Sequence, residues 1–143
     1  MAAARTPLPD LPKGYRFPDT SFELTAEHVE GYLAAVGDAN RLYLERGLAP
    51  PLAVAARGLG ALLELVELPA GSLHTGQEME ARAGVPIGAA LTLSGGIAQR
   101  SERAGLIISV IEFEITPAGS TMAAVAGRTT VLAPADVSSG APA

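Results

Sequence analysis

The sequence predicts a single α+β domain in which an antiparallel sheet wraps around one long buried helix. Three observations lead to this prediction. The chain has 143 residues, the usual size of one domain. A strongly apolar segment between residues 51 and 67 is long enough for a buried helix. Segments typical of strands follow it with short connections, which favour antiparallel neighbours.

Both ends of the chain are predicted to lie outside this domain. Residues 1–20 are expected to form an extended arm along the surface, because prolines recur there: Pro7, Pro9, Pro12 and Pro18. Residues 134–143 are small and weakly apolar, and they are expected to form a flexible tail. The folded domain is therefore predicted to span residues 21–133.

A first helix is predicted to begin after Thr25, whose hydroxyl can cap the first turn. Val29, Leu33 and Val36 recur at helical spacing and form one apolar stripe. Gly37 is expected to end this helix in a left-handed conformation.

The second helix is predicted from Pro51 to Glu67. Pro51 suits a first helical turn, where its missing N–H is not needed. The segment is apolar nearly all round, which predicts burial on most sides. Gly58 and Gly60 each cost about 1 kcal/mol relative to alanine inside a helix. We therefore expect another backbone to pack closely against them.

After residue 71 the pattern changes to that of strands. The four predicted strands are Leu73–Ala81, Ala90–Gln99, Leu106–Thr116 and Thr121–Leu132. The third is the richest in β-branched residues. Its alternation places Ile111, Phe113 and Ile115 on one face. Glu112 and Glu114 then lie on the other.

Composition excludes several classes of function. The chain is 48% hydrophobic, carries a net charge of -5, and its 10 lysines and arginines are scattered, which argues against nucleic-acid binding. It has no cysteine, hence no disulfide framework. No apolar run reaches the length of about 18 residues that a membrane span needs. We see no metal-ligand spacing and no phosphate-binding loop, and we expect a cytoplasmic protein without cofactor or metal.

The loop after the first helix carries the most specific motif. It reads Gly-Asp-Ala-Asn-Arg-Leu-Tyr over residues 37–43, and it resembles the Gly-Asp-x-Asn-Pro-x-His loop of the MaoC-like hydratases and dehydratases. Gly37, Asp38 and Asn40 match that loop. Arg41 stands in place of the proline, and Tyr43 in place of the histidine. The resemblance covers roughly residues 20–133 and implies a hot-dog domain.

Two later segments extend the resemblance. Residues 73–80 contain His74, Gln77 and an alternation of glutamates, and they are similar to a strand of the N-terminal, FAS1-like dehydratase halves. Residues 85–88, Val-Pro-Ile-Gly, are similar to the turn that follows in those proteins, but Ala89 replaces the acidic residue expected next.

The resemblance implies a chemistry that these replacements would impair. In catalytic members an aspartate and a histidine activate a water that adds to an enoyl thioester, and dehydration is the reverse. A histidine is a base near neutral pH, whereas a phenol has a reference pKa near 10. Those enzymes also use a backbone N–H at the start of the long helix to stabilise the thioester oxyanion. The matching position is Pro51, which has no N–H.

The resemblance therefore gives six candidate site residues. Asp38, Tyr43 and His74 are the catalytic candidates, and Asn40, Pro51 and Gln77 are the substrate-binding ones. Four of them also have a plainer explanation. Asp38 and Asn40 are common turn residues. Tyr43 fits a half-buried position with a satisfied hydroxyl, and His74 fits a hydrogen-bonded structural role.

Four functions remain open on these residues. The first is an acyl-binding subunit of a heteromeric (3R)-hydroxyacyl-thioester dehydratase, in which a partner chain supplies the intact loop. The second is a homodimeric enoyl-CoA hydratase that uses Asp38. The third is an acyl-CoA thioesterase or acyl-thioester binder, and the fourth is a structural or regulatory domain that no longer binds a thioester. The expected ligand is an acyl thioester of coenzyme A or acyl carrier protein, and the expected assembly is a homo-oligomer or a heterodimer with a catalytic chain.

Overall fold

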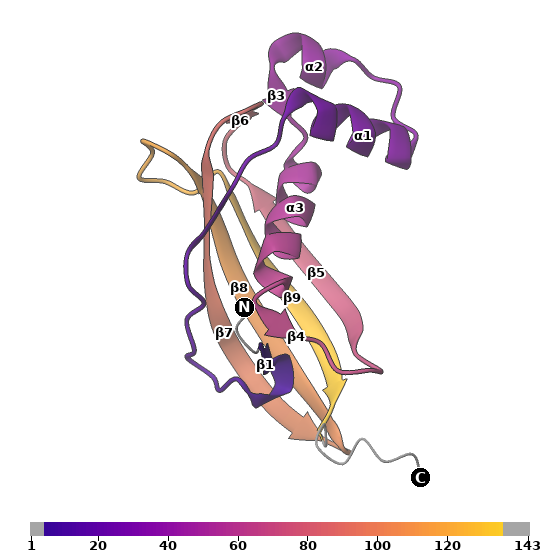
Figure 1. The fold of residues 1–143 in the computed structure, drawn as a ribbon, viewed down its shortest axis with the longest axis vertical. Helices are drawn as coiled ribbons and strands as arrows, with labels where there is room; N and C mark the ends of the chain where they lie inside the picture. The colour runs from indigo at the N-terminus through magenta and orange to yellow at the C-terminus, as the bar shows by residue number, and fades with distance from the viewer. Residues whose placement is uncertain (1–4, 136–143) are drawn as a thin grey trace.

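The computed structural model describes residues 5–135, which form a five-stranded antiparallel sheet with one long helix across one face (Figure 1). The sheet order is β2 (Thr20–Phe22), β7 (Leu91–Arg103), β8 (Leu106–Pro117), β9 (Val125–Pro134) and β5 (Leu73–Ala81). The predicted α+β class is confirmed. We call the face that α3 (Pro51–Leu63) covers the inner face, and the opposite face the outer face.

The last three strands form the predicted meander, but β5 does not lie beside β7. It pairs with β9 at the far edge of the sheet. The connection between β5 and β7 crosses the end of the sheet through β6 (Val85–Pro86), which pairs with β3 (Leu48–Ala49). That pairing involves residues far apart in the sequence, so the turn residues alone did not reveal it.

Strand β8 has the predicted division between its faces. Ile111, Phe113 and Ile115 are buried on the inner face, whereas Glu112 and Glu114 are exposed on the outer face. This alternation places the apolar side chains under α3 and fixes the register of the central strands.

Helix α3 begins at Pro51 as predicted but ends at Leu63, so the prediction of Glu67 was wrong. Val66 and Glu67 instead form β4, which pairs in parallel with β1 (Thr6–Pro7). The prediction that this helix is buried on most sides was also wrong. Ala53, Val54, Ala55, Gly58 and Leu62 are buried against the rest of the domain, but Leu52 on the other side is 53% exposed. The sheet covers only one side of the helix, and the exposed residues on the other are Leu52, Ala56, Arg57 and Gly60.

The two helical glycines differ in their surroundings. A β-carbon on Gly58 would lie 2.7 Å from Ile115 Cδ1 and 3.1 Å from Leu93 Cδ1, so side chains of the sheet require a glycine there. Around Gly60 no atom outside the helix lies within 4 Å of that position. The prediction that another backbone packs against both glycines was therefore wrong: side chains approach Gly58, and nothing outside the helix approaches Gly60.

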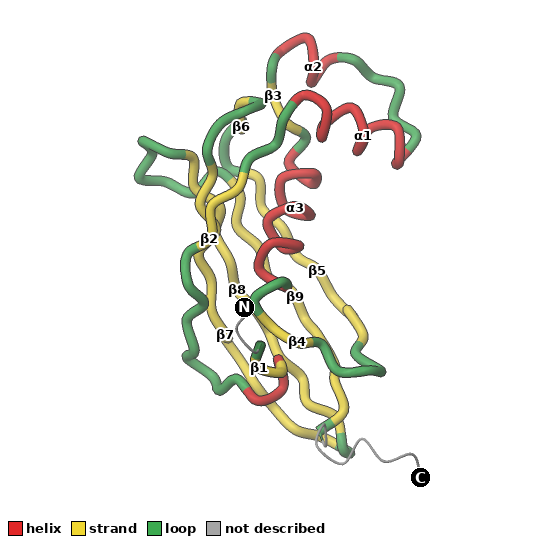
Figure 2. Tube along the Cα trace, in the orientation of Figure 1, coloured by secondary structure: helices red, strands yellow, loops and turns green. Residues whose placement is uncertain are grey.

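The N-terminal arm is extended, but the prediction of a surface position was wrong for its apolar side chains. Leu8, Leu11 and Phe17 are each buried in the core. The short 3-10 helix η1 (Leu8–Asp10) packs on β8 and β9, and the arm then runs as loop alongside β7 (Figure 2). The Arg100 Nε–H also donates to the Pro9 carbonyl at 2.8 Å. The arm buries sheet surface that the short α3 does not reach.

The predicted C-terminal tail lies outside the described residues from position 136 onward. Pro134 belongs to β9, where it pairs with Leu106.

The first helix, α1 (Ala26–Val36), has the predicted caps. Thr25 is the N-cap, and Gly37 ends the helix with a φ of 71°. Val29 and Leu33 are buried, but Val36 is 57% exposed because it lies at the free end of the stripe. His28 completes a capping box: its N–H donates to Thr25 Oγ1 at 3.2 Å, and its Nδ1 accepts from the Thr25 N–H at 3.1 Å.

This cap gives a prediction for stability. His28→Ala should lower the free energy of unfolding by about 1 kcal/mol, because the Thr25 N–H loses its acceptor. His28→Gln is the matched control, since an amide oxygen at this position can accept the same hydrogen bond. Urea denaturation of both variants measures the effect, and equal losses would contradict a capping role for this side chain.

Candidate functional site

The loop between α1 and α2 (Leu42–Arg46) consists of two successive side-chain turns. Asp38 Oδ1 accepts from the Asn40 N–H at 2.9 Å, and Asn40 Oδ1 accepts from the Leu42 N–H at 2.9 Å. Both side chains are exposed. Arg41 lies 3.6 Å from Glu30, and this exposed ion pair adds little stability. The structure therefore shows Asp38 and Asn40 as turn residues that also face solvent.

Tyr43 lies in the first turn of α2 and is half-buried against the hydrophobic core. Gly47 ends this helix in the left-handed conformation, and β3 then leads directly to the start of α3. The short path from Asp38 to Pro51 keeps the loop, Tyr43 and the start of α3 at one end of the domain (Figure 1).

The start of α3 combines two prolines. Pro50 is the N-cap and makes no side-chain cap, and Pro51 is the first helical residue. The Val54 N–H donates to the Pro50 carbonyl at 3.1 Å and closes the first turn. A helix start leaves its first N–H groups without intrahelical acceptors. Because Pro51 has none, the first such donors belong to Leu52 and Ala53.

His74 and Gln77 lie elsewhere. They belong to β5, which starts near the C-terminal end of α3, at the opposite end from the loop (Figure 1). His74 Nε2 lies 3.0 Å from the Gly76 carbonyl oxygen, beside a bulge in the strand. Gln77 Oε1 accepts from Thr129 Oγ1 at 2.7 Å. Within one protomer the structure brings Asp38, Asn40, Tyr43 and Pro51 to one end and His74 to the other.

A small groove of about 300 Å³ lies beside the start of α3, between α1 and α3. Its lining residues are Leu24, His28, Tyr32, Ala53, Ala56 and Arg57. The sequence interpretation did not assign them to a site. The sequence feature that could have indicated the groove is the pair of small residues Ala53 and Ala56. In the structure they line the groove together with Tyr32 of α1.

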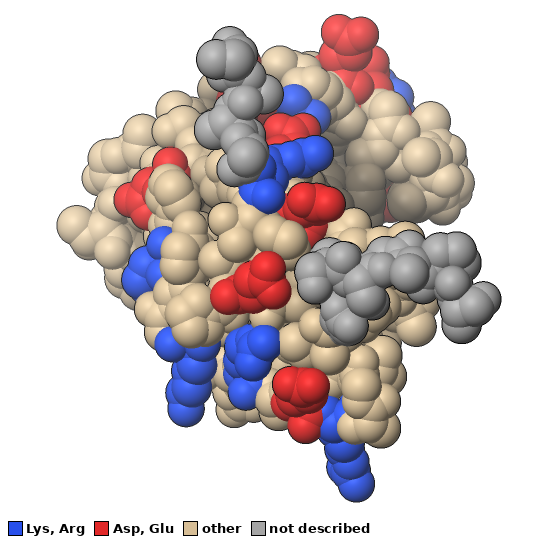
Figure 3. All heavy atoms as spheres, turned by 60° about the horizontal axis from the view of Figure 1, so that its bottom comes forward, with Lys and Arg blue, Asp and Glu red and all other residues tan. Residues whose placement is uncertain are grey.

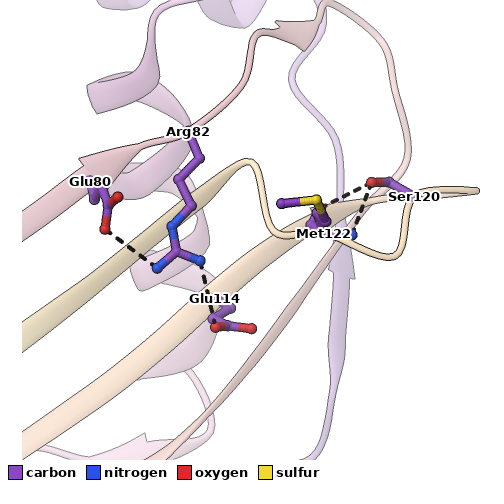
Figure 4. A network of polar contacts seen from close by, with 5 residues as sticks. All are labelled: Glu80, Arg82, Glu114, Ser120 and Met122. Atoms are coloured by element: carbon purple, nitrogen blue, oxygen red, sulfur yellow. Dashed lines mark hydrogen bonds and ion pairs between the residues drawn. The ribbon is translucent and has the colours of Figure 1, made fainter.

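The outer face of the sheet carries alternating charges. Arg82 bridges two glutamates, at 3.4 Å from Glu80 and 4.0 Å from Glu114 (Figure 4). Arg128 forms an ion pair with Glu112, and this hydrogen bond, together with the charge of Glu112, raises the pKa of the guanidinium. Basic and acidic side chains are also intermingled on the face shown in Figure 3.

The described residues show neither a metal-binding cluster nor a membrane-spanning helix. In residues 5–135, no three histidine or acidic side chains gather closely enough to hold a metal ion. No helix in this part of the chain is both long and apolar enough to cross a bilayer.

Comparison with known proteins identifies the fold. No family model matches the sequence, and no curated protein is significantly similar to it. Solved structures are similar over nearly the whole chain. An (R)-hydratase from A. caviae involved in PHA biosynthesis is 22% identical, with a TM-score of 0.73 over 87% of this chain and 98% of the hydratase. A MaoC-like dehydratase from Rhodospirillum rubrum is 14% identical, with a TM-score of 0.69 over 89% and 95%.

This chain has the hot-dog fold. The expected fold is thereby confirmed. A third similar structure is the HadBC (3R)-hydroxyacyl-ACP dehydratase complex from Mycobacterium tuberculosis, which is 19% identical. Its TM-score is 0.66 over 82% of this chain and 93% of the matched chain. In the hot-dog fold of this protein, the loop of residues 37–43 and the two prolines lie at the same end of α3.

Proposed function

We propose that this protein is an acyl-thioester-binding subunit of a (3R)-hydroxyacyl-thioester dehydratase or hydratase of the MaoC-like family. The observation that carries this proposal is the fold match over 87% of the chain. The loop resemblance supports it, because it puts Tyr43 and Pro51 where the family chemistry needs a base and a donor. A phenol is a poor base at neutral pH, and a proline offers no N–H to an oxyanion.

The loop geometry supports a binding role. Asp38 is an acceptor in a turn that it makes with Asn40, and Tyr43 packs against the core. We propose that these three side chains, with Pro51, surround the thioester end of the ligand. His74 and Gln77 lie on the exposed strand β5 and belong to the surface that a partner chain covers.

A catalytic partner would complete such a subunit. The HadBC dehydratase of Mycobacterium tuberculosis is a complex and has the same fold. We propose the same kind of assembly here: the partner carries the intact Asp/His loop, and this chain supplies part of the acyl-binding surface. The ligand is an acyl thioester of coenzyme A or acyl carrier protein.

The first test separates binding from turnover. The purified protein should bind crotonyl-CoA in a calorimetric titration and should hydrate it at no more than a trace rate, followed by loss of the enoyl absorbance. A missing acid–base group alone costs about 10²–10⁴-fold in rate. Efficient turnover that disappears in Asp38→Asn would favour a self-sufficient hydratase. A folded protein that binds neither crotonyl-CoA nor a longer enoyl-CoA would refute the proposal.

A further inference from the structure

The groove between α1 and α3 lies on the side of α3 that faces away from the sheet. Ala53, Ala56 and Arg57 line it from α3, whereas Gly58, on the other side of the helix, packs against the sheet. None of the six candidate site residues lines this groove. It is therefore made by a different set of residues from the proposed thioester site.

The floor and one wall of the groove are apolar. Leu24 and Ala53 are 3% and 4% exposed, and Tyr32 is half-buried against the hydrophobic core. The small side chains of Ala53 and Ala56 leave a space of about 300 Å³. Small-molecule sites have volumes of about 300–1,000 Å³, so this groove fits a ligand at the small end of that range.

The polar groups of the groove are hydrogen-bond donors. The Thr25 N–H donates to His28 Nδ1 at 3.1 Å, so a neutral His28 carries its proton on Nε2 and can donate from there. Arg57 Nε donates to the Glu23 carbonyl at 3.0 Å, which orients the guanidinium and leaves its Nη groups as donors. None of the ion pairs among residues 5–135 includes Arg57. The groove therefore combines one positive charge with a second donor.

No carboxylate opposes that charge within the groove. Glu23 and Glu27 are close in sequence and exposed, but neither belongs to the lining. An apolar floor beside a guanidinium complements a ligand with an apolar body and one anionic group. A carboxylate matches the planar fork of a guanidinium through two parallel hydrogen bonds. A nucleotide carries several negative charges, and the lining offers only Arg57 as a permanent cation.

We infer that this groove binds a small monocarboxylate whose body is a ring or a short branched chain. The apolar body lies on Leu24, Ala53 and Tyr32, and the carboxylate accepts hydrogen bonds from Arg57 and His28. The inference is independent of the proposed function, because the two sites share no residue. Benzoate has this chemistry and serves as the probe.

The test is a titration of the isotope-labelled protein with benzoate, followed by the NMR shifts of its backbone amides. Amides of α1 and of the first turns of α3 should shift and saturate at millimolar concentration, as expected for so small a ligand. Benzamide has the same shape without the charge, and inorganic phosphate has charge without the apolar body. Each should bind at least about 5-fold more weakly than benzoate.

Two variants remove one feature of the groove each. Ala56→Leu fills the space at an exposed helical position and should weaken benzoate binding at least about 10-fold. Its matched control is Ala34→Leu, the same change on an exposed residue of α1 outside the groove. Arg57→Gln removes the charge and should weaken binding at least about 5-fold. Its control is Arg103→Gln, on an exposed residue of β7. Both controls should bind benzoate like the wild type.

Several results would overturn the inference. Benzoate causes no saturating shift in these amides up to about 50 mM, or the variants bind as tightly as their controls. Phosphate that binds as tightly as benzoate would mean an adventitious ion only. If Ala56→Leu does not fold by circular dichroism, Arg57→Gln decides the outcome.

A competition experiment separates this site from the proposed function. Benzoate should leave the affinity for crotonyl-CoA unchanged, and mutual displacement would assign the groove to the thioester site and overturn the inference. A protein that binds benzoate as described but does not bind crotonyl-CoA would count only against the proposed function.

Discussion

Replacing Tyr43 by histidine and Pro51 by glycine together should give a protein that hydrates crotonyl-CoA faster than either single variant does. A positioned base is worth about 10²–10⁴-fold and an oxyanion donor about 10²–10³-fold. Tyr43→His alone should remain slow, because residue 51 still offers no N–H. Pro51→Gly alone should remain slow too, because no base lies on α2. The double variant should exceed the product of the two effects, since residues that act as a unit are not additive.

The measurement is loss of enoyl absorbance, with Tyr43→His/Pro51→Gly/Asp38→Asn as the control for the loop carboxylate. Unfolding curves come first, because glycine at a helix start increases the entropy of the unfolded chain. Efficient hydration by Tyr43→His alone would show that Pro51 is not at the oxyanion position, and the Leu52 N–H would be the next donor. A double variant that folds and binds crotonyl-CoA but stays inert would mean that the Asp38–Asn40 turn holds the carboxylate in the wrong place.

Gly127→Ala should be among the most destabilising single changes in the sheet. A β-carbon at this position would lie 2.5 Å from Phe113 Cζ and 2.8 Å from the Glu78 carbonyl oxygen. The carbonyl belongs to the backbone of β5 and cannot move without distorting the ladder. Overpacking of this kind costs about 1–3 kcal/mol and occasionally more, and we expect the upper end.

The matched control is Gly76→Ala on the neighbouring strand. Its nearest contact would be the Thr130 side chain at 3.6 Å, an ordinary van der Waals distance. Urea denaturation should therefore show a large loss for Gly127→Ala and a small change for Gly76→Ala. Phe113→Leu should relieve part of the clash when it is combined with Gly127→Ala, so the two losses should not add. Equal losses for the two glycine variants would contradict the packing seen around Phe113.

The loop of residues 37–43 shows which features of the candidate site a local motif predicts. Its altered residues are visible in the sequence, because Arg41 and Tyr43 can be compared directly with the family pattern. The hydrogen bonds of Asp38 and Asn40 also agree with the explanation that both are turn residues. The roles of all six candidate residues stay predictions, as does the similarity to the FAS1-like halves.

The sequence by itself determined the local structure. Thr25 and Gly37 set the ends of α1, since a cap acts on the backbone of its own turn. Leu73 and Ala81 bound β5 as predicted. The period-two pattern of β8 decided which side chains face the core, because the pleat turns successive residues to opposite faces.

Only the tertiary structure decided what depends on distant parts of the chain. Residues 66–67 became a strand because the N-terminal residues 6–7 pair with them. Leu8 and Phe17 are buried because α3 ends early and leaves sheet surface that the arm covers. His74 lies far from Asp38 because β5 begins at the opposite end of α3. Each outcome rests on contacts between segments distant in sequence, which no local pattern of residues specifies.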